Sequence, residues 1–271
     1  MCDVRLIALD LDGTLLDDDK GIHPDNIAAL REATCRGVPV AISSGRMIPR
    51  IEPVQDRLGL DCVLLAYNGA KVVGTRAEGR PLIRHRPVPA DVADFFLAYS
   101  RRHDILLNFF HDDRLYAEAS PARERFAELY SRRTGAEYRF GCLDEMAGTN
   151  PTKLILLCDP PQCERLRDRF RVELAGRAHV AISEPEYLEI TAAGVNKGEA
   201  LASIAAHHGC SVEQVMALGD AENDAPMLEV AGLAVAVANA RSSVKEMVDF
   251  VTERTNNEGG VAEAVRRFVL E

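Results

Sequence analysis

The sequence has no apolar run that approaches the roughly 18 residues needed to span a bilayer. Its first residues, Met1 to Arg5, lead directly into a strand-like segment and lack the layout of a secretory signal peptide. Positive charge is scarce, because 32 Lys and Arg stand against 42 Asp and Glu, for a formal net charge of −10. We therefore expect no membrane and no nucleic acid among its partners, although a local anion site is compatible with such a chain.

Cysteines are scattered, their count of seven is odd, and no Cys-x-x-Cys pair occurs. This pattern argues against a disulfide framework and against a zinc site. We expect buried, reduced thiols in a cytoplasmic protein. The sequence limits the oligomeric state only to a monomer or a small homo-oligomer.

What the chain does have is enough apolar residues, 47% of 271, for one large core or two modest ones. Its first half alternates apolar strand-like runs with helical segments. A run over 4–10 precedes a helix that Pro24 opens and Gly37 closes, and further runs follow over 38–43 and 62–66. This order predicts an α/β fold with a doubly wound, mainly parallel sheet.

The middle of the chain, residues 84–186, mixes strands with two long helix candidates over 121–134 and 161–175. After it the α/β rhythm resumes, with strands over 215–218 and 233–237 and a last helix over 259–268. We expect a core formed by 1–83 and 187–271, with an α+β domain inserted between its halves.

Asp10 and Asp12 follow the first predicted strand, where open parallel sheets bind their ligands. Residues i and i+2 leave a strand on one side, so both carboxylates can face one ligand. Their repulsion would raise the pKa of one of them, and a divalent cation such as Mg²⁺ would relieve it. A plain turn is the alternative. A calcium loop fits poorly, because Thr14-Leu15-Leu16 breaks its template.

Two further segments suit phosphate. Ser43-Ser44-Gly45-Arg46 ends the second strand, and a hydroxyl beside a glycine before a helix can seat an anion. Lys197 lies in a glycine-flanked turn that follows a strand over 188–190 and opens a helix. A simple helix cap and a solvated lysine are the alternatives.

The fourth segment, Asp220-Ala221-Glu222-Asn223-Asp224, follows the apolar strand over 215–218. It is either an acidic first turn that the helix dipole favours or a metal site. The four segments thus place a carboxylate pair, a hydroxyl, an ammonium and an acidic cluster at successive strand ends. We expect all four on the carboxyl edge of one sheet.

These segments resemble the four motifs of the haloacid dehalogenase superfamily, in the form found in Cof-type sugar phosphatases with an inserted type IIB cap. The likeness spans the whole chain and also includes Tyr67-Asn68-Gly69-Ala70. Ser44 stands where Thr is usual, and Asn196 stands where Ser is frequent. Both keep a short polar side chain, so the chemistry is unaffected. The resemblance implies a Rossmannoid catalytic core and makes residues 84–186 a cap that selects substrate.

The resemblance also implies the catalytic roles. Asp10 would attack phosphorus and form an aspartyl-phosphate. Asp12 would protonate the leaving alcohol and then activate the water that hydrolyses the intermediate. Ser44 and Lys197 would hold the phosphoryl oxygens, and Asn223 would contact phosphate.

For the cofactor, the resemblance implies Mg²⁺ held by Asp10, the backbone carbonyl of Asp12 and Asp220. Asp224 would orient its neighbours. Arg46 would contact either the substrate or a nearby acidic residue.

We therefore expect a Mg²⁺-dependent phosphatase of small phosphorylated metabolites, with sugar phosphates as the first candidates. Pyridoxal phosphate or a nucleotide as substrate, and a phosphomutase or phosphotransferase outcome, remain alternatives on the same machinery. A non-catalytic phospho-acceptor sensor fits less well, because a receiver domain has no inserted cap. The sequence names neither the metabolite nor the cap residues that contact it.

Overall fold

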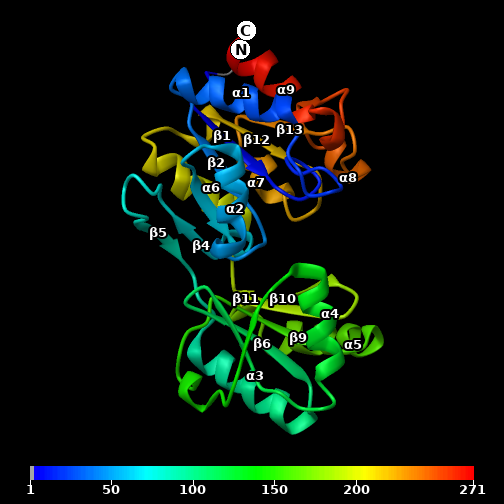
Figure 1. Cartoon of the computed structure of the whole chain (residues 1–271). Helices are drawn as coiled ribbons and strands as arrows, with labels where there is room; N and C mark the ends of the chain where they lie inside the picture. The colour runs from blue at the N-terminus through cyan, green and yellow to red at the C-terminus, as the bar shows by residue number, and fades with distance from the viewer. Residues whose placement is uncertain (1–2) are drawn as a thin grey trace. The chain divides into compact units, whose positions relative to one another are not determined.

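The computed structural model describes residues 3–271, which divide into two compact units. Unit 1 contains the described residues up to His85 together with Asn196–Glu271, and unit 2 contains Arg86–Val195. Figure 1 shows both, with unit 2 in the green part of the colour range. The predicted α/β class and the insertion of one unit within the other are confirmed.

An eight-stranded sheet in the order β14-β13-β12-β1-β2-β3-β4-β5 forms the centre of unit 1. Its pairs are parallel from β14 to β3 and antiparallel at β4 and β5. The strands are β1 (Leu6–Asp10), β2 (Val40–Ser43), β3 (Val63–Ala66), β4 (Lys71–Val73), β5 (Leu82–His85), β12 (Val215–Gly219), β13 (Leu233–Ala236) and β14 (Phe250–Val251). Strands β1, β2, β3, β12 and β13 are buried throughout, which explains their continuous apolar runs.

Helices cover this sheet. They are α1 (Pro24–Cys35), α2 (Ile48–Leu58), α6 (Lys197–His207), α7 (Ala225–Val230), α8 (Ser242–Lys245) and α9 (Gly260–Val265). Helical turns lie at η1 (Tyr67–Gly69), η3 (Val212–Gln214) and η4 (Asn256–Glu258), and a π-turn, η5 (Arg266–Leu270), extends α9. Apolar residues of α6 and α7 pack on the sheet in one core, and α1 lies beside α9 (Figure 1).

Unit 2 has its own six-stranded sheet in the order β10-β11-β9-β6-β7-β8, antiparallel except for the β7–β8 pair. Its strands are β6 (Leu106–His111), β7 (Arg114–Ala117), β8 (Tyr138–Phe140), β9 (Lys153–Leu157), β10 (Ala178–Glu184) and β11 (Tyr187–Ala192). Its helices are α3 (Ala90–His103), α4 (Glu124–Thr134), the turn η2 (Asp144–Met146) and α5 (Pro160–Glu173). Residues of α3 and α5 pack with one sheet face around Phe96 and Phe170, so unit 2 has an independent core.

The return from unit 2 to unit 1 differs from the expected boundary at 186. Strand β11 pairs antiparallel with both β10 and β9, so it belongs to the second sheet. The chain re-enters unit 1 at Asn196. The segment over 188–190 was correctly expected to be a strand, but only its pairing partners show which sheet contains it.

The described cysteines are all free, which agrees with the expectation of reduced thiols, and Cys2 lies outside the described residues. The expectation that they are buried is confirmed for Cys62, Cys158 and Cys163. It is wrong for Cys35 and Cys142, which are exposed, and Cys210 is partly buried. Within residues 3–271, no helix combines the length and apolar character of a membrane span.

Candidate active site

Three parallel strands end together at the candidate site. The last residue of β1, Asp10, pairs with Ser43 of β2, and Leu9 pairs with Leu218 of β12. The chain leaving β1 carries Asp12, the chain leaving β2 carries Ser44, and the chain leaving β12 carries Asp220. The parallel pairing therefore gathers three of the four predicted segments at one sheet edge.

Lys197 reaches this site differently from the prediction. The strand before it, β11, belongs to unit 2, so Lys197 does not lie at a strand end of the core sheet. It is the first residue of α6, whose N-cap Asn196 accepts a hydrogen bond from the Glu199 N–H at 2.8 Å. The cap fixes the start of the helix, and with it the place from which the lysine side chain extends.

The Lys197 ammonium is buried between two carboxylates. Its Nζ lies 2.6 Å from Asp10 Oδ1 and 2.6 Å from Asp224 Oδ1, and the lysine is 0% exposed. Burial alone disfavours the ammonium, but the two carboxylates outweigh this and hold the pKa of Lys197 above its usual range. A solvated lysine is therefore excluded, and a fixed positive charge stands beside Asp10.

Asp10 is surrounded by more negative charge, from Asp220 and Asp224, than the Lys197 ammonium neutralises. Burial raises the pKa of Asp10 to about 8, against the opposing pull of Lys197, and Asp224 and Asp220 raise it further. Burial likewise raises the pKa of Asp220 to about 6, although the Thr14 hydroxyl donates to its Oδ1 at 2.8 Å. The crowded carboxylates leave a demand for further positive charge at this point.

Both Asp224 oxygens are already hydrogen-bonded. Its Oδ1 binds Lys197, and its Oδ2 accepts the N–H groups of Asp220 at 3.0 Å and Ala221 at 3.1 Å. A Cβ on Gly219 would lie 2.6 Å from the Asp224 Cβ, so only glycine allows this approach. Asp224 therefore orients the lysine and the loop after β12.

The donor set fits a hard divalent cation. One side-chain oxygen from each of Asp10, Asp220 and Asp224 lies within 4.8 Å of the others. Asp224 already accepts three hydrogen bonds, which favours Asp10 and Asp220 as the side chains that would hold the ion. All-oxygen ligands with excess negative charge are those that Mg²⁺ prefers. The Asp12 side chain is outside this cluster, and its predicted contribution is the backbone carbonyl.

Asp12 faces two cations instead. Arg46 donates from Nε to Oδ2 at 2.8 Å and from Nη2 to Oδ1 at 2.5 Å, and Lys20 Nζ donates to Oδ1 at 3.0 Å. Burial opposes the charge on Asp12, but Arg46 and Lys20 outweigh it and lower the pKa of this carboxyl. Of the two alternatives for Arg46, the structure shows the ion pair with an acidic residue.

Ser44 lies four residues before α2, so it is neither the cap of that helix nor at its N-terminus. Its N–H donates to the Leu65 carbonyl at 2.9 Å, and its Oγ accepts the Arg46 N–H at 3.2 Å. The hydroxyl thus belongs to a tight turn that also places Arg46.

The segment after β3, to which the sequence assigned no role, contacts two of the predicted site residues. Tyr67 and Asn68 both have left-handed backbones, with φ of 53° and 54°. The Asn68 N–H donates to the Ser44 carbonyl at 3.1 Å, and Asn223 Nδ2 lies 3.5 Å from Asn68 Oδ1. Strained backbone of this kind clusters at ligand sites. The Asn-Gly pair of Tyr67-Asn68-Gly69-Ala70 was the signal that the sequence offered.

Similarity to known proteins extends over nearly the whole chain. The family model for haloacid dehalogenase-like hydrolases matches residues 7–265. A 5-amino-6-(5-phospho-D-ribitylamino)uracil phosphatase of Bacillus subtilis is 32% identical over 270 residues, which cover 99% of this chain and 97% of that protein. An HMP-PP phosphatase of Serratia proteamaculans is 29% identical, covering 90% of this chain and 87% of that one.

Solved structures with the same fold also match nearly the whole chain. A Thermotoga maritima protein superimposes with a TM-score of 0.89 at 31% identity, covering 99% of this chain and all of that one. A haloacid dehalogenase-like hydrolase of Bacteroides thetaiotaomicron gives a TM-score of 0.88 at 27% identity, covering 97% of this chain and 99% of that one.

Proposed function

The chain belongs to the haloacid dehalogenase-like hydrolases, whose relatives here are phosphatases, and from this we propose that it hydrolyses phosphate monoesters of small metabolites through an aspartyl-phosphate. The observation that supports this most is the buried Asp10 beside Lys197 and Asp220. A carboxylate attacks an anionic phosphate only where positive charge is supplied at the same point.

In this proposal Asp10 attacks phosphorus and the bond from phosphorus to the leaving oxygen breaks. Lys197 and Ser44 hold the phosphoryl oxygens, and Asn223 contacts the phosphate. Fixed donors aimed at the developing charge lower the barrier because they need no reorganisation during the reaction. Asp224 keeps Lys197 directed at Asp10 through its 2.6 Å contact.

Asp12 is the proposed acid and base. It gives a proton to the departing alcohol oxygen, then takes one from the water that attacks the aspartyl-phosphate. In the structure its carboxylate is paired with Arg46 and Lys20, so it has to receive a proton before it can act as the acid.

Mg²⁺ is the proposed cofactor, held by the side chains of Asp10 and Asp220 and by the Asp12 carbonyl. When bound, it would neutralise the phosphoryl charge and orient the phosphate for in-line attack. The raised pKa values of Asp10 and Asp220 support this, because a cation at that point would offset both the burial that is their largest cause and the repulsion between carboxylates that adds to it.

Unit 2 is the proposed cap. Every residue to which we assign a chemical role lies in unit 1, which leaves substrate selection and exclusion of water to unit 2. We further propose that the protein acts in the cytoplasm, where free thiols persist.

The proposed substrates are sugar phosphates and related phosphorylated polyols. The ribityl phosphate named for the Bacillus subtilis relative belongs to this class, since its phosphate is carried by a sugar-alcohol chain. Pyridoxal phosphate and nucleotides are the second candidates on the same machinery, and the Serratia proteamaculans relative is named for another compound, HMP-PP. Transfer of the phosphoryl group to a sugar hydroxyl would use the same residues and differ only in the acceptor.

The test is a panel of sugar phosphates, polyol phosphates, nucleotides and pyridoxal phosphate, with inorganic phosphate measured in Mg²⁺ buffer. We expect phosphate release that is strongest among the sugar and polyol esters and absent in Asp10→Asn. Release that persists in Asp10→Asn would contradict the mechanism. Conversion to an isomeric phosphate ester without free phosphate would identify a transferase.

A further inference from the structure

The loop after Thr14 turns sharply at Lys20 and directs this lysine at Asp12. Asp17 closes the turn: its N–H donates to the Gly21 carbonyl at 3.1 Å, and its Oδ1 accepts the Gly21 N–H at 2.6 Å. Lys20 itself has φ of 63°, and its N–H donates to the Asp17 carbonyl at 3.0 Å. A non-glycine residue in this region costs about 1–2 kcal/mol.

Two contacts from elsewhere in unit 1 hold the turn in place. Arg57, near the end of α2, donates from Nη1 to the Lys20 carbonyl at 2.6 Å. Asp18 and Asn257 bond twice, from the Asp18 N–H to Oδ1 and from Nδ2 to the Asp18 carboxylate, both at 3.0 Å. The turn is thus fixed on both sides of Lys20, and the ammonium reaches Asp12 from a defined point.

The stability of the fold does not account for this arrangement. The Lys20 side chain is 61% exposed, and an exposed ion pair contributes only about 0–1 kcal/mol. That gain does not exceed the cost of the left-handed backbone. A strained residue whose carbonyl is anchored and whose side chain contacts a proposed acid and base points to a role in the reaction.

The bonding of the two Asp12 oxygens is unequal. Oδ1 receives both Lys20 Nζ and Arg46 Nη2, whereas Oδ2 receives Arg46 Nε alone. A carboxylate oxygen has two lone pairs, so Oδ2 keeps acceptor capacity that Oδ1 has used. Lys20 therefore selects which oxygen of Asp12 is available to the reacting groups.

We propose that Lys20 is a positioning residue for Asp12, holding Oδ1 so that Oδ2 is the oxygen that carries the proton to and from the reacting groups. This inference rests on the proposed function, in which Asp12 is the acid and base. The Lys20 ammonium bonds to Asp12 and not to Asp10, the proposed attacking residue. Its removal should therefore slow only those steps that need Asp12.

The test compares two esters of similar size, 4-nitrophenyl phosphate and 4-nitrobenzyl phosphate. The nitrophenolate leaves without protonation, whereas the benzyl alkoxide needs the acid. The parameter is kcat/KM, which reports on the steps up to departure of the leaving group. The variants are Lys20→Gln, the charge-retaining Lys20→Arg, and Lys245→Gln as a control that removes the same charge from α8.

We expect Lys20→Gln to lower kcat/KM for the nitrobenzyl ester about fivefold, the scale of an exposed ion pair, and to change the nitrophenyl value less than twofold. Lys20→Arg should keep most of the activity, and Lys245→Gln should match the wild type on both esters. An equal loss on both esters, or no loss on either, would overturn the assignment. A wild-type protein that hydrolyses neither these esters nor the metabolite panel would instead contradict the proposed function, and with it this inference.

Discussion

At the scale of single residues, the site is organised around a shortage of positive charge. Lys197 compensates Asp10 and Asp224 at 2.6 Å each, whereas Asp220 stands close by and accepts a hydrogen bond from the neutral Thr14 hydroxyl. Burial, with the neighbouring carboxylates adding to it, raises the pKa of Asp10 to about 8 and the pKa of Asp220 to about 6. Removing one partner from such a buried group of charges lowers the free energy of unfolding strongly, because it leaves a buried charge without compensation.

Gly13 gives a sharp test of how Asp220 is placed. Its φ is 87°, and a Cβ there would lie 2.5 Å from Asp220 Oδ2. We expect Gly13→Ala to displace this carboxylate and to lower kcat/KM by about 10–100-fold, as loss of a residue that orients a metal ligand does. Steady-state kinetics with titrated Mg²⁺ measure the effect.

The matched control for that variant is Gly37→Ala. Gly37 has the same φ of 87°, but nothing lies within 4 Å of its added Cβ. Both variants should lose stability from the left-handed backbone, about 1 kcal/mol by urea unfolding, and only Gly13→Ala should lose activity. Equal activity in the two variants would show that Asp220 tolerates displacement and is not a metal ligand.

Residue types were more predictable than their partners. Asp10, Asp12, Ser44, Lys197 and Asp220 follow from acidic or polar residues at element ends. The sequence could not show that Lys20 pairs with Asp12, because the contact depends on the left-handed turn at Lys20 and its anchor on Arg57. Nor could it show that Asp224 binds Lys197 through one oxygen and the loop after β12 through the other.

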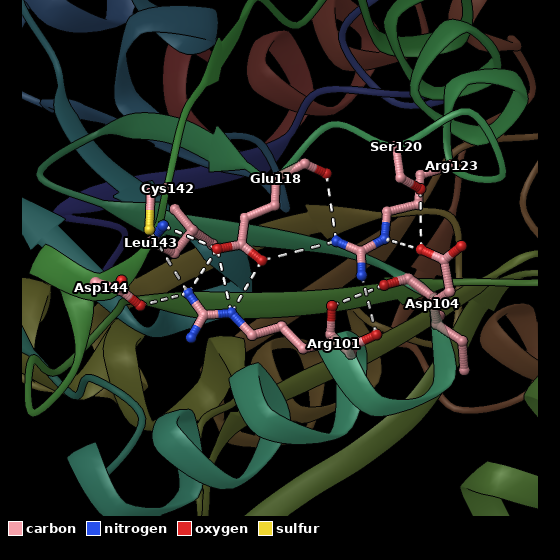
Figure 2. Close-up of polar contacts among 10 residues, drawn as sticks. Arg101, Asp104, Glu118, Ser120, Arg123, Cys142, Leu143 and Asp144 are labelled. Atoms are coloured by element: carbon pink, nitrogen blue, oxygen red, sulfur yellow. Dashed lines mark hydrogen bonds and ion pairs between the residues drawn. The ribbon is translucent and has the colours of Figure 1, made fainter.

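At the scale of elements, a network in unit 2 fixes where α4 begins. Arg123 donates to Asp104 Oδ1 at 2.9 Å and to the Ser100 carbonyl at 3.1 Å, and Arg101 donates to Glu118 and Asp144 (Figure 2). These contacts tie the end of α3 to the chain after β7. The helix expected from Pro121 therefore starts at Glu124.

This network predicts an acid-sensitive contribution to stability. The hydrogen bond from Arg101 lowers the pKa of Glu118, and the Leu143 N–H and the charges of Arg101 and Arg123 add to the shift against the effect of burial. The Glu118 carboxyl therefore binds its proton less tightly in the folded state than in the unfolded state. Its contribution to the free energy of unfolding is fully present above the ordinary pKa of glutamate, and it is lost as the pH falls through the lowered pKa of the folded state. Urea unfolding of the whole chain at pH 6 and pH 4 measures this.

The variant Glu118→Gln should lose stability at pH 6 and show a smaller further loss at pH 4 than the wild type. Glu137→Gln, which removes an exposed carboxylate before β8, is the control and should follow the wild type at both values. If Glu118→Gln keeps the full wild-type pH dependence, the network does not couple protonation to folding.

Strand and helix order was predictable, because buried parallel strands have continuous apolar sequences. Assignment of strands to sheets was not. β11 contains apolar residues and precedes the helix that carries Lys197, as a strand of the first sheet would, yet it pairs with β9 and β10 of the second unit. Strands β4 and β5 escaped prediction because they are short and β5 is largely uncovered, with Leu82 at 58% exposure.

At the scale of the whole molecule, we propose that unit 1 carries out the reaction and that unit 2 selects the substrate. A ligand that binds only the folded state stabilises it by about 2.7 kcal/mol at a hundred times its Kd. We therefore expect saturating Mg²⁺ to raise the melting temperature by about 5 °C, given the usual change for chains of this size. Differential scanning fluorimetry with and without a chelator measures the shift.

The variant Asp220→Asn tests whether that shift comes from the proposed site. It removes one of the two side chains that we propose to hold the ion, so its shift should be much smaller. An unchanged shift would mean that Mg²⁺ binds elsewhere on the chain.

The central claim is that Asp10 becomes phosphorylated during turnover. The most direct measurement uses Asp12→Ala with 4-nitrophenyl phosphate, because this leaving group needs no acid while the intermediate then lacks the base that activates water. After an acid quench, mass spectrometry should find one phosphoryl group on the peptide that contains Asp10, removable by hydroxylamine and missing when Asp10 is also changed to Asn. Nitrophenolate release with no phosphoryl group on that peptide, or with the group on another residue, would contradict the account.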